Sequence, residues 1–198
     1  METVYSLSFP EPDINKREIM RYMSSLGGDE IIELIDECLA EARATLQYKV
    51  CYAVLSAETN GDTIALPCGQ IESKNLARNL SGCDKTIVFA ATIGVGIDRL
   101  ISKYSRLSPT KALCFQAIGA ERVEALCDEF CEKMKSEYEK NGERLKPRFS
   151  PGYGDLPLAT QKMIFALLDC PKRIGVTLGD TLLMSPSKSV TAFVGIPG

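Results

Sequence analysis

Histidine is absent from this chain of 198 residues. Imidazole is the usual base beside a serine or cysteine nucleophile, and it is a common ligand of zinc in enzymes. Its absence therefore excludes Ser/His/Asp and Cys/His nucleophilic catalysis and most zinc enzymes. A functional site in this protein has to depend on other side chains.

Cys-x-x-Cys pairs are absent as well, although the chain holds eight cysteines. An even count can indicate disulfides, but the chain is large and shows no export signal. Cys127 and Cys131 lie four residues apart on one expected helix, a spacing at which two thiols can share a metal. Because neither a third thiol nor a histidine is near, small buried thiols are the better interpretation, and no metal site is expected.

Long apolar runs and basic stripes are also missing. No run approaches the ~20 apolar residues that span a bilayer, and the N-terminus, Met-Glu-Thr-Val-Tyr, lacks the basic and apolar parts of a signal peptide. The net charge is −3 at pH 7 and lysine and arginine form no stripe, which argues against a nucleic-acid binder. We therefore expect a cytoplasmic protein with no nucleic-acid or membrane partner, while a flavoprotein or small-molecule partner stays open.

The chain does contain a series of short periodic segments, and its length fits one domain, 1–198, with an extended arm at 1–12. Asn15 with Glu18 forms a plausible capping box for a first helix that Gly27-Gly28 ends. Helical spacing predicts further helices over 29–46, 73–80, 97–104, 109–140 and 158–168. Alternating or continuous apolar patterns predict strands over 48–54, 63–66, 85–92, 181–184 and 190–196. This order favours an α+β fold, a mainly antiparallel twisted sheet flanked by helices, over a doubly wound fold.

The first candidate site is the turn Thr92-Ile93-Gly94-Val95-Gly96, between an expected strand and an expected helix. A glycine-rich turn at a helix N-terminus can hold a phosphate or carboxylate on free N–H groups. Arg99 stands where a full Gly-x-Gly-x-x-Gly pattern has its third glycine. A tight strand-to-helix turn is therefore the preferred interpretation, and anion binding is the alternative.

The second candidate is the segment 148–157, Arg-Phe-Ser-Pro-Gly-Tyr-Gly-Asp-Leu-Pro. Arg148 offers a planar fork that grips a carboxylate in bidentate fashion. The prolines stiffen the backbone, whereas Gly152 and Gly154 let it approach a ligand closely. Tyr153 stands between these glycines and can present its ring and hydroxyl to a cofactor. By spacing alone, a ligand loop and a rigid loop with a core tyrosine are equally good interpretations.

The pattern Arg-x-x-x-Gly-Tyr, formed by Arg148, Gly152 and Tyr153, resembles the S-adenosylmethionine-binding motif of the activation (reactivation) domain of cobalamin-dependent methionine synthase. Pro157 matches a proline that follows the tyrosine in that family. The Arg-x-x-x-Gly-Tyr pattern becomes fairly specific when it occurs in order with other segments of the family.

Two further segments carry the resemblance. Residues 120–125, Ala-Glu-Arg-Val-Glu-Ala, resemble the family's helix before the motif. Residues 184–190, Met-Ser-Pro-Ser-Lys-Ser-Val, resemble its Met-x-Pro-x-x-Ser-Val segment. The resemblance covers about 110–196 well and the N-terminal half loosely.

The resemblance implies a domain that binds S-adenosylmethionine and presents it to cobalamin. In that family, cobalamin oxidised to the cob(II) state is rescued by reductive methylation, with an electron from a flavodoxin-like donor. Because this chain has no imidazole to offer a cobalt, the cobalamin is expected on a separate methionine synthase or corrinoid protein. The leading hypothesis is therefore a stand-alone reactivation subunit that acts in trans.

The resemblance also implies roles for individual residues. Arg148 would hold the methionyl carboxylate, and Ser150 and Gly152 would add backbone contacts. Glu124 would contact a polar or cationic part of the ligand, although it can equally be a solvated helix residue or a structural partner of Arg148. Tyr153 would face the corrin and is the expected catalytic residue.

Two alternatives remain. The acidic ligand residue near the family domain's N-terminus has no clear match here, and the chain ends at Gly198, before the family's last ligand contact. These departures favour a non-catalytic interaction module that docks on a corrinoid protein without using S-adenosylmethionine. An ordinary methyltransferase for a small acceptor is the third hypothesis, which the incomplete glycine motif disfavours.

Overall fold

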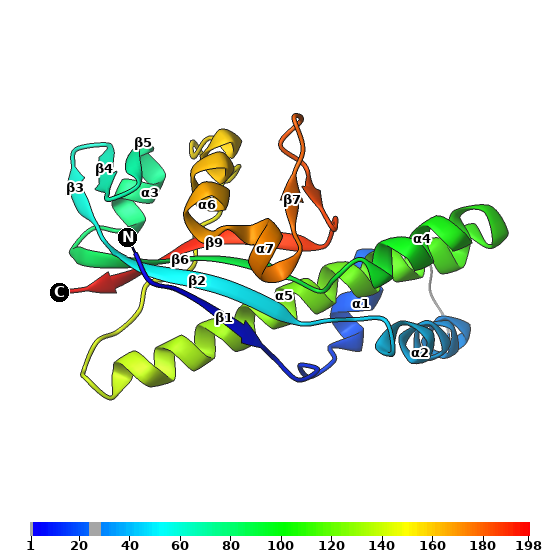
Figure 1. Cartoon of the computed structure of the whole chain (residues 1–198). Helices are drawn as coiled ribbons and strands as arrows, with labels where there is room; N and C mark the ends of the chain where they lie inside the picture. The colour runs from blue at the N-terminus through cyan, green and yellow to red at the C-terminus, as the bar shows by residue number, and fades with distance from the viewer. Residues whose placement is uncertain (1, 24–28) are drawn as a thin grey trace.

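A four-stranded antiparallel sheet organises the chain (Figure 1), in a computed structural model that describes residues 2–23 and 29–198. In spatial order its strands are β1 (Val4–Ser8), β2 (Lys49–Ser56), β6 (Cys83–Thr92) and β9 (Ser189–Pro197). Most residues of β6 and β9 are buried, because structure covers both faces of the sheet. The predicted α+β fold with a mainly antiparallel sheet and flanking helices is confirmed.

Four helices form the layer on one face of the sheet; the longest of them contacts the strands, and the other three pack mainly on that helix. The four helices are α1 (Lys16–Met23), α2 (Asp29–Arg43), α4 (Gly96–Leu107) and α5 (Pro109–Glu139). The long helix α5 begins after Ser108, whose hydroxyl accepts a hydrogen bond from Lys111 N, and Pro109 fits its first turn. Its apolar side chains pack on β6 and β9 around Phe89, Phe115 and Phe130.

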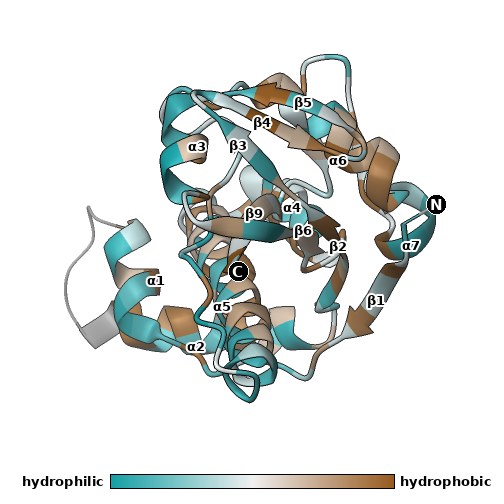
Figure 2. Cartoon of the chain, turned by 90° about the vertical axis from the view of Figure 1, so that its left-hand side faces the viewer, coloured by the Kyte–Doolittle hydropathy of each residue, from teal (hydrophilic) through white to brown (hydrophobic). Residues whose placement is uncertain are grey.

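A second layer covers the opposite face, as Figure 2 shows from the end of the sheet. It contains a small sheet of β3 (Glu58–Asn60), β4 (Thr63–Leu66) and β5 (Gly69–Glu72), followed by α3 (Lys74–Asn79). A 3₁₀ turn (Leu158–Thr160), α6 (Gln161–Leu168), α7 (Cys170–Ile174) and the hairpin of β7 (Thr177–Leu178) with β8 (Met184–Ser185) complete it. Phe193 of β9 packs in this second core with Leu156 and Leu168.

Several predicted boundaries are wrong. The strand expected at 181–184 is the two-residue β8, because Leu182 takes a positive φ of 63° in the hairpin turn. The helix expected to reach residue 46 ends at Arg43. Within the arm at 1–12, the chain forms the edge strand β1. The predicted helix stop at Gly27-Gly28 lies outside the described residues.

The segment between β1 and α1 is fastened to α5 by a buried ion pair. Arg122 is fully buried and donates to the carbonyls of Pro12 at 2.7 Å and Asp13 at 2.6 Å. Glu121 pairs with Arg122 and accepts a hydrogen bond from Asn15 N at 2.9 Å. Asn15 in turn accepts from Glu18 N at 3.3 Å, as the predicted capping box requires. Glu121 therefore takes the place at the Asn15 N–H that a capping box gives to its glutamate.

The glycine turn at 92–96 has a structural explanation. Gly94 has φ +82° and donates its N–H to the Thr92 hydroxyl at 3.1 Å. A Cβ on Gly96 would lie 2.2 Å from the Thr45 carbonyl oxygen, so only glycine fits there. These contacts agree with the interpretation as a tight strand-to-helix turn. Within residues 2–23 and 29–198, no helix is both long and apolar enough to cross a membrane.

Candidate functional site

The second candidate segment lies along the free edge of β9. Phe149 N donates to Phe193 O at 2.8 Å and Phe193 N returns a bond to Phe149 O at 2.9 Å. Lys146 N also donates to Gly195 O at 2.9 Å. Backbone pairing to a central sheet therefore fixes the start of the segment, which we call the motif loop (residues 148–157).

Beyond Pro151 the motif loop turns sharply and leaves the sheet. Gly152 has φ +87° and donates its N–H to Leu156 O at 2.9 Å, and Tyr153 N donates to Ser150 O at 3.1 Å. Gly154 has φ +56°, and a Cβ there would lie 2.3 Å from an Asn75 side-chain nitrogen. Both glycines are thus required by the backbone or by close packing.

Tyr153 stands at the apex of this turn with 73% of its surface exposed. Its ring packs edge to face against Phe149, with 6.3 Å between centroids. The interpretation of Tyr153 as a core tyrosine is therefore wrong. The ring is held outward, where it can meet another molecule.

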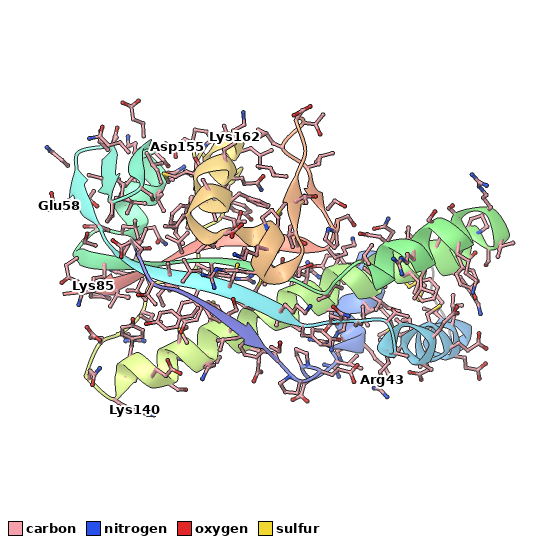
Figure 3. All side chains as sticks on the ribbon, in the orientation of Figure 1. Arg43, Glu58, Lys85, Lys140, Asp155 and Lys162 are labelled. Atoms are coloured by element: carbon pink, nitrogen blue, oxygen red, sulfur yellow. The ribbon has the colours of Figure 1, made fainter. Side chains whose placement is uncertain are left out.

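Asp155 fastens the motif loop to the N-terminus of α3, and Figure 3 shows it beside that helix. Its carboxylate accepts hydrogen bonds from the Ser73 hydroxyl at 2.5 Å and from Lys74 N and Asn75 N at 2.9 and 3.1 Å. The hydrogen bond from Ser73 and those from the backbone hold the pKa of Asp155 below its ordinary value. Ser73 caps α3, as predicted, and links it to the loop.

Arg148 points to the opposite side of the sheet edge, toward α5. Its Nη2 donates to Glu124 Oε2 at 2.6 Å and to Asp128 Oδ1 at 3.1 Å. Burial lowers the pKa of Arg148, but nearby negative groups including Glu124 and Asp128 outweigh it and raise the pKa. Within the described chain, Nη1 and Nε make no hydrogen bond, so part of the guanidinium fork remains available to a carboxylate.

These residues share one pocket of about 660 Å³ beside β9. Arg148, Ser150, Tyr153 and Glu124 line it together. Gly152, the remaining predicted site residue, shapes the loop but does not line the pocket. The pocket also receives side chains from the predicted family segment 184–190 and from three residues without a sequence signal; the latter are Asn79, Gln161 and Thr191.

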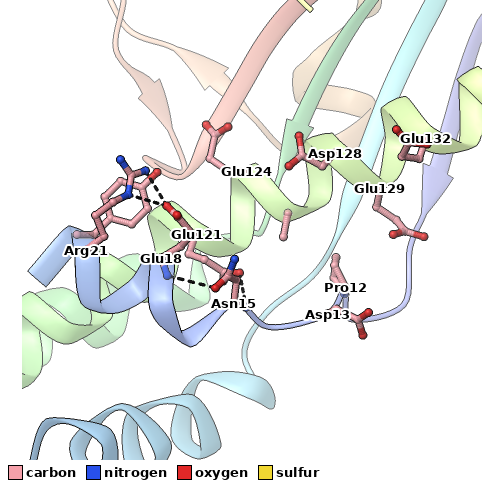
Figure 4. Close-up of a pocket in the computed structure, with 12 residues that line it drawn as sticks. Pro12, Asp13, Asn15, Glu18, Arg21, Glu121, Glu124, Asp128, Glu129 and Glu132 are labelled. Atoms are coloured by element: carbon pink, nitrogen blue, oxygen red, sulfur yellow. Dashed lines mark hydrogen bonds and ion pairs between the residues drawn. The ribbon is translucent and has the colours of Figure 1, made fainter. Parts of the chain in front are cut away.

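An acidic groove of about 440 Å³ adjoins this pocket at Glu124 and lies between α1 and α5 (Figure 4). Its acidic lining comprises Asp13, Glu18, Glu121, Glu124, Asp128, Glu129 and Glu132. Arg21 also lines it, and its guanidinium pairs with Glu18 at 2.6 Å. Partial desolvation on the surface of α5 raises the pKa of Asp128, and the charges of Glu124 and Glu132 add to the shift, whereas Arg148 opposes it.

The two cysteines of α5 are free thiols that pack against the core. Cys127 is buried and Cys131 is half-buried. Burial raises the pKa of the Cys131 thiol to about 11 and that of Cys127 further. Burial thus disfavours the thiolate form of both side chains. In the part of the chain that the structure describes, no three cysteine, aspartate or glutamate residues form a group suited to a metal.

Comparisons with known proteins agree with this architecture. The family described as "Vitamin B12 dependent methionine synthase, activation domain" matches residues 73–196, which is more than half of the chain. Among solved structures, "Crystal Structure of the MetH Reactivation Domain bound to AdoHcy" is similar with a TM-score of 0.69 and 16% sequence identity. The similarity covers 98% of this chain and 78% of that one, and it shows a shared fold. No curated protein matches the sequence. The resemblance seen in the sequence is thereby confirmed, and the chain belongs to the activation-domain family of vitamin B12 dependent methionine synthase.

Proposed function

We propose that this protein binds S-adenosylmethionine in the pocket beside β9 and supports reductive methylation of cob(II)alamin. The cobalamin would be held by a separate methionine synthase or corrinoid protein, and a flavodoxin-like protein would donate the electron. One observation carries the proposal: Arg148, which suits a carboxylate, and the exposed Tyr153 line the same open pocket. The chain's membership in the activation-domain family also supports the proposal.

The pocket has the size and charge for such a ligand. Its volume of about 660 Å³ lies within the range of about 300–1,000 Å³ typical of small-molecule sites. The open part of the Arg148 fork suits the methionyl carboxylate, and Glu124 beside it suits the ammonium group. Ser150 lines the pocket, whereas Gly152 does not and has its N–H bonded to Leu156 O, so the backbone of Ser150 is the loop's expected contact for a ligand.

When bound, S-adenosylmethionine would supply an electrophilic methyl group that the partner's cobalamin accepts together with one electron. The chain's own residues position the two molecules. Arg148 anchors one end of the ligand inside the pocket. Tyr153 stands at the pocket's exposed rim, supported by Phe149, and would face the partner's corrin ring and exclude water from the space between them.

Calorimetric titration with S-adenosylmethionine and S-adenosylhomocysteine tests the proposal. Wild-type protein should bind both, and Arg148→Ala should weaken binding by roughly 30-fold or more, since a truncated charge contact costs about 2–5 kcal/mol. Arg144→Ala, which removes an exposed arginine outside the pocket, should bind as wild type does. Absence of heat with wild-type protein would contradict the proposal.

One observation favours a second function, because Arg148 already has two carboxylate partners in the protein. In an interaction module that docks on a corrinoid protein without using S-adenosylmethionine, Arg148 would bind no ligand, and Glu124 and Asp128 would neutralise its charge. Co-precipitation with the corrinoid partner that survives both Arg148→Ala and Tyr153→Phe, together with a silent titration, would support that function.

A further inference from the structure

The strand β1 forms one edge of the four-stranded sheet, opposite the edge at β9 (Figure 2). Within the described residues, β2 is the one strand that pairs with β1. The sequence of β1, Val-Tyr-Ser-Leu-Ser, contains neither a charged residue nor a proline. Charges and prolines are the residues that usually protect an exposed edge from pairing with another chain. The outer side of β1 is therefore open to a further strand.

The register of β1 shows which of its backbone groups are open. Phe9 N donates to Tyr48 O at 2.9 Å, and this pair continues the antiparallel register between β1 and β2. On an antiparallel strand every second residue directs its N–H and C=O to the same side, so alternate residues before Phe9 pair with β2. The residues between them direct these groups away from the sheet; they are Val4, Ser6 and Ser8. These backbone groups are the hydrogen-bonding sites that β1 offers.

The side of this edge that belongs to the second layer carries positive charge. Arg173 of α7 donates from Nη1 to the Ser6 hydroxyl at 3.4 Å, and the neighbouring Lys172 is exposed. Lys49 of β2 points to the same side as Cys51, which packs in the second core. None of these three cations forms a salt bridge in the part of the chain that the structure describes. A strand placed here would meet cations without acidic partners.

The side of the edge that belongs to the helix layer offers an apolar surface instead. Tyr5 is 48% exposed, and its ring stacks on Tyr52 of β2 with 5.1 Å between centroids. Lys133 and Glu137 of α5, the charged residues near Tyr52, pair with each other at 2.8 Å. The two sides of the edge thus differ, because one presents aromatic surface and the other presents positive charge.

A second copy of this chain fits the edge poorly. Antiparallel pairing that uses all the open backbone groups would set Ser6 opposite the same serine of the copy, with about 5.5 Å between the Cα atoms. Since each Ser6 has Arg173 beside it, the two guanidiniums would face each other across the twofold axis. Like charges at so short a distance repel each other. The edge therefore suits a strand that brings negative charge.

We propose that β1 binds an extended acidic segment of another protein as an additional strand of the sheet. Backbone hydrogen bonds to the open groups of β1 supply the affinity, and alternate side chains supply the selectivity. Carboxylates of the segment meet Arg173 and Lys49 on one side, while the intervening apolar side chains pack on Tyr5 on the other. Because β1 and β9 are opposite edges, the pocket beside β9 stays open when the segment is bound.

Fluorescence anisotropy with two labelled peptides tests the charge preference. One peptide alternates valine with glutamate and the other alternates valine with lysine, so they share length and pattern. Wild-type protein should bind the glutamate peptide about tenfold more tightly than the lysine peptide, and added salt should reduce the difference. Arg173→Gln should weaken binding of the glutamate peptide about fivefold, as expected for one charge pair open to water. Arg106→Gln, which removes an exposed arginine in the last turn of α4, should bind as wild type does.

A backbone variant separates strand pairing from charge attraction. Ser6→Pro removes an outward N–H but none of the donors that pair with β2, so the fold should be kept. Binding of the glutamate peptide should fall about tenfold or more, whereas Ser6→Ala, which keeps the N–H, should bind as wild type does. Amide hydrogen exchange of wild-type protein gives a direct readout: the glutamate peptide should slow exchange at Val4, Ser6 and Ser8.

Several results would overturn the proposal. Absence of binding by the glutamate peptide, equal binding of the two peptides, or binding that Ser6→Pro leaves unchanged would each do so. Sedimentation that shows wild-type dimers, lost in Ser6→Pro, would assign the edge to a second copy instead. Titration with S-adenosylhomocysteine should give the same result for wild type and Ser6→Pro, so that failure of the proposed function and failure of this proposal are distinguishable.

Discussion

The pocket beside β9 and the acidic groove meet at Glu124, yet they differ in construction. The pocket holds Arg148, unpartnered polar atoms and an exposed aromatic ring at its rim. The acidic groove gathers carboxylates along α5 and around α1, and its deepest carboxylate, Glu121, is fully used in holding the chain segment before α1. The pocket therefore presents open polar groups, whereas the carboxylates of the groove lie along a solvated helix face beside a structural ion pair.

This contrast shows how the chain divides its charged residues. Glu121 and Arg122 are adjacent in the sequence and similar in kind to Glu124 and Arg148, but they are buried and satisfied by each other and by the backbone. Arg148 keeps part of its fork open and is 25% exposed in its side chain. Charge type alone thus does not distinguish Arg148 from Arg122; the unused donors of Arg148 and its place at an open sheet edge do.

Removing the ring of Tyr153 should have the largest effect on activity. In an assay of reductive methylation with the corrinoid partner, Tyr153→Ala should lower the rate by roughly 100-fold, as expected when reacting groups lose their positioning. The melting temperature should stay unchanged, because the ring is mostly exposed. S-adenosylhomocysteine affinity should change little. An unaltered rate would show that the rim of the pocket does not face the corrin.

The two carboxylates that pair with Arg148 should respond in opposite directions. Glu124→Gln should weaken S-adenosylmethionine binding by about tenfold, because the ligand's ammonium loses a charged partner. Asp128→Asn should leave binding unchanged or strengthen it severalfold, because the guanidinium loses a competitor. Isothermal titration of both variants measures the difference. Stronger binding in both would assign Glu124 a structural role only.

Carboxylates of the acidic groove that lie away from Glu124 should matter less. Glu129→Gln and Glu132→Gln should each change S-adenosylmethionine affinity by less than about twofold, since exposed charges interact weakly through water. The same titration at low and moderate salt checks this. A larger loss than for Glu124→Gln would reverse the assignment and make the groove part of the site.

The sequence predicted best the elements whose pattern is local and continuous. The apolar run of β6 and the helical spacing of α5 placed both elements to within a few residues. β1 was expected only as an extended arm, because its pairing with β2 joins residues far apart in the chain. β5 and α7 were missed because they are short and lack the alternation that revealed β4, a strand of the same length as β5.

The same limit applies to the site. Arg148 and Tyr153 were identified from a recognisable motif, and the structure brings them to one pocket. Gln161 and Thr191 carry no motif, and only the fold shows that their side-chain oxygens are buried in the pocket without partners. Asp155 lies within the motif loop, but its role in fastening that loop depends on a hydrogen bond from Ser73, 82 residues earlier in the chain. Contacts between distant segments therefore account for what the sequence did not reveal.

The smallest expected effect concerns Asp155. Its carboxylate fastens the motif loop to the N-terminus of α3 and makes no contact with the acidic groove. Its folded-state pKa lies below its unfolded value, so its contribution to stability is present above about pH 4 and is lost as the pH falls through the folded pKa. Thermal denaturation of wild type should therefore show a small drop in melting temperature below about pH 4 that Asp155→Asn lacks. At pH 7, the variant should also bind S-adenosylhomocysteine slightly more weakly, because a looser loop places Phe149 and Ser150 less well at the pocket. The variant could instead match wild type in both its ligand affinity and the dependence of its melting temperature on pH. The pairing of the loop with β9 would then fix the shape of the pocket without Asp155.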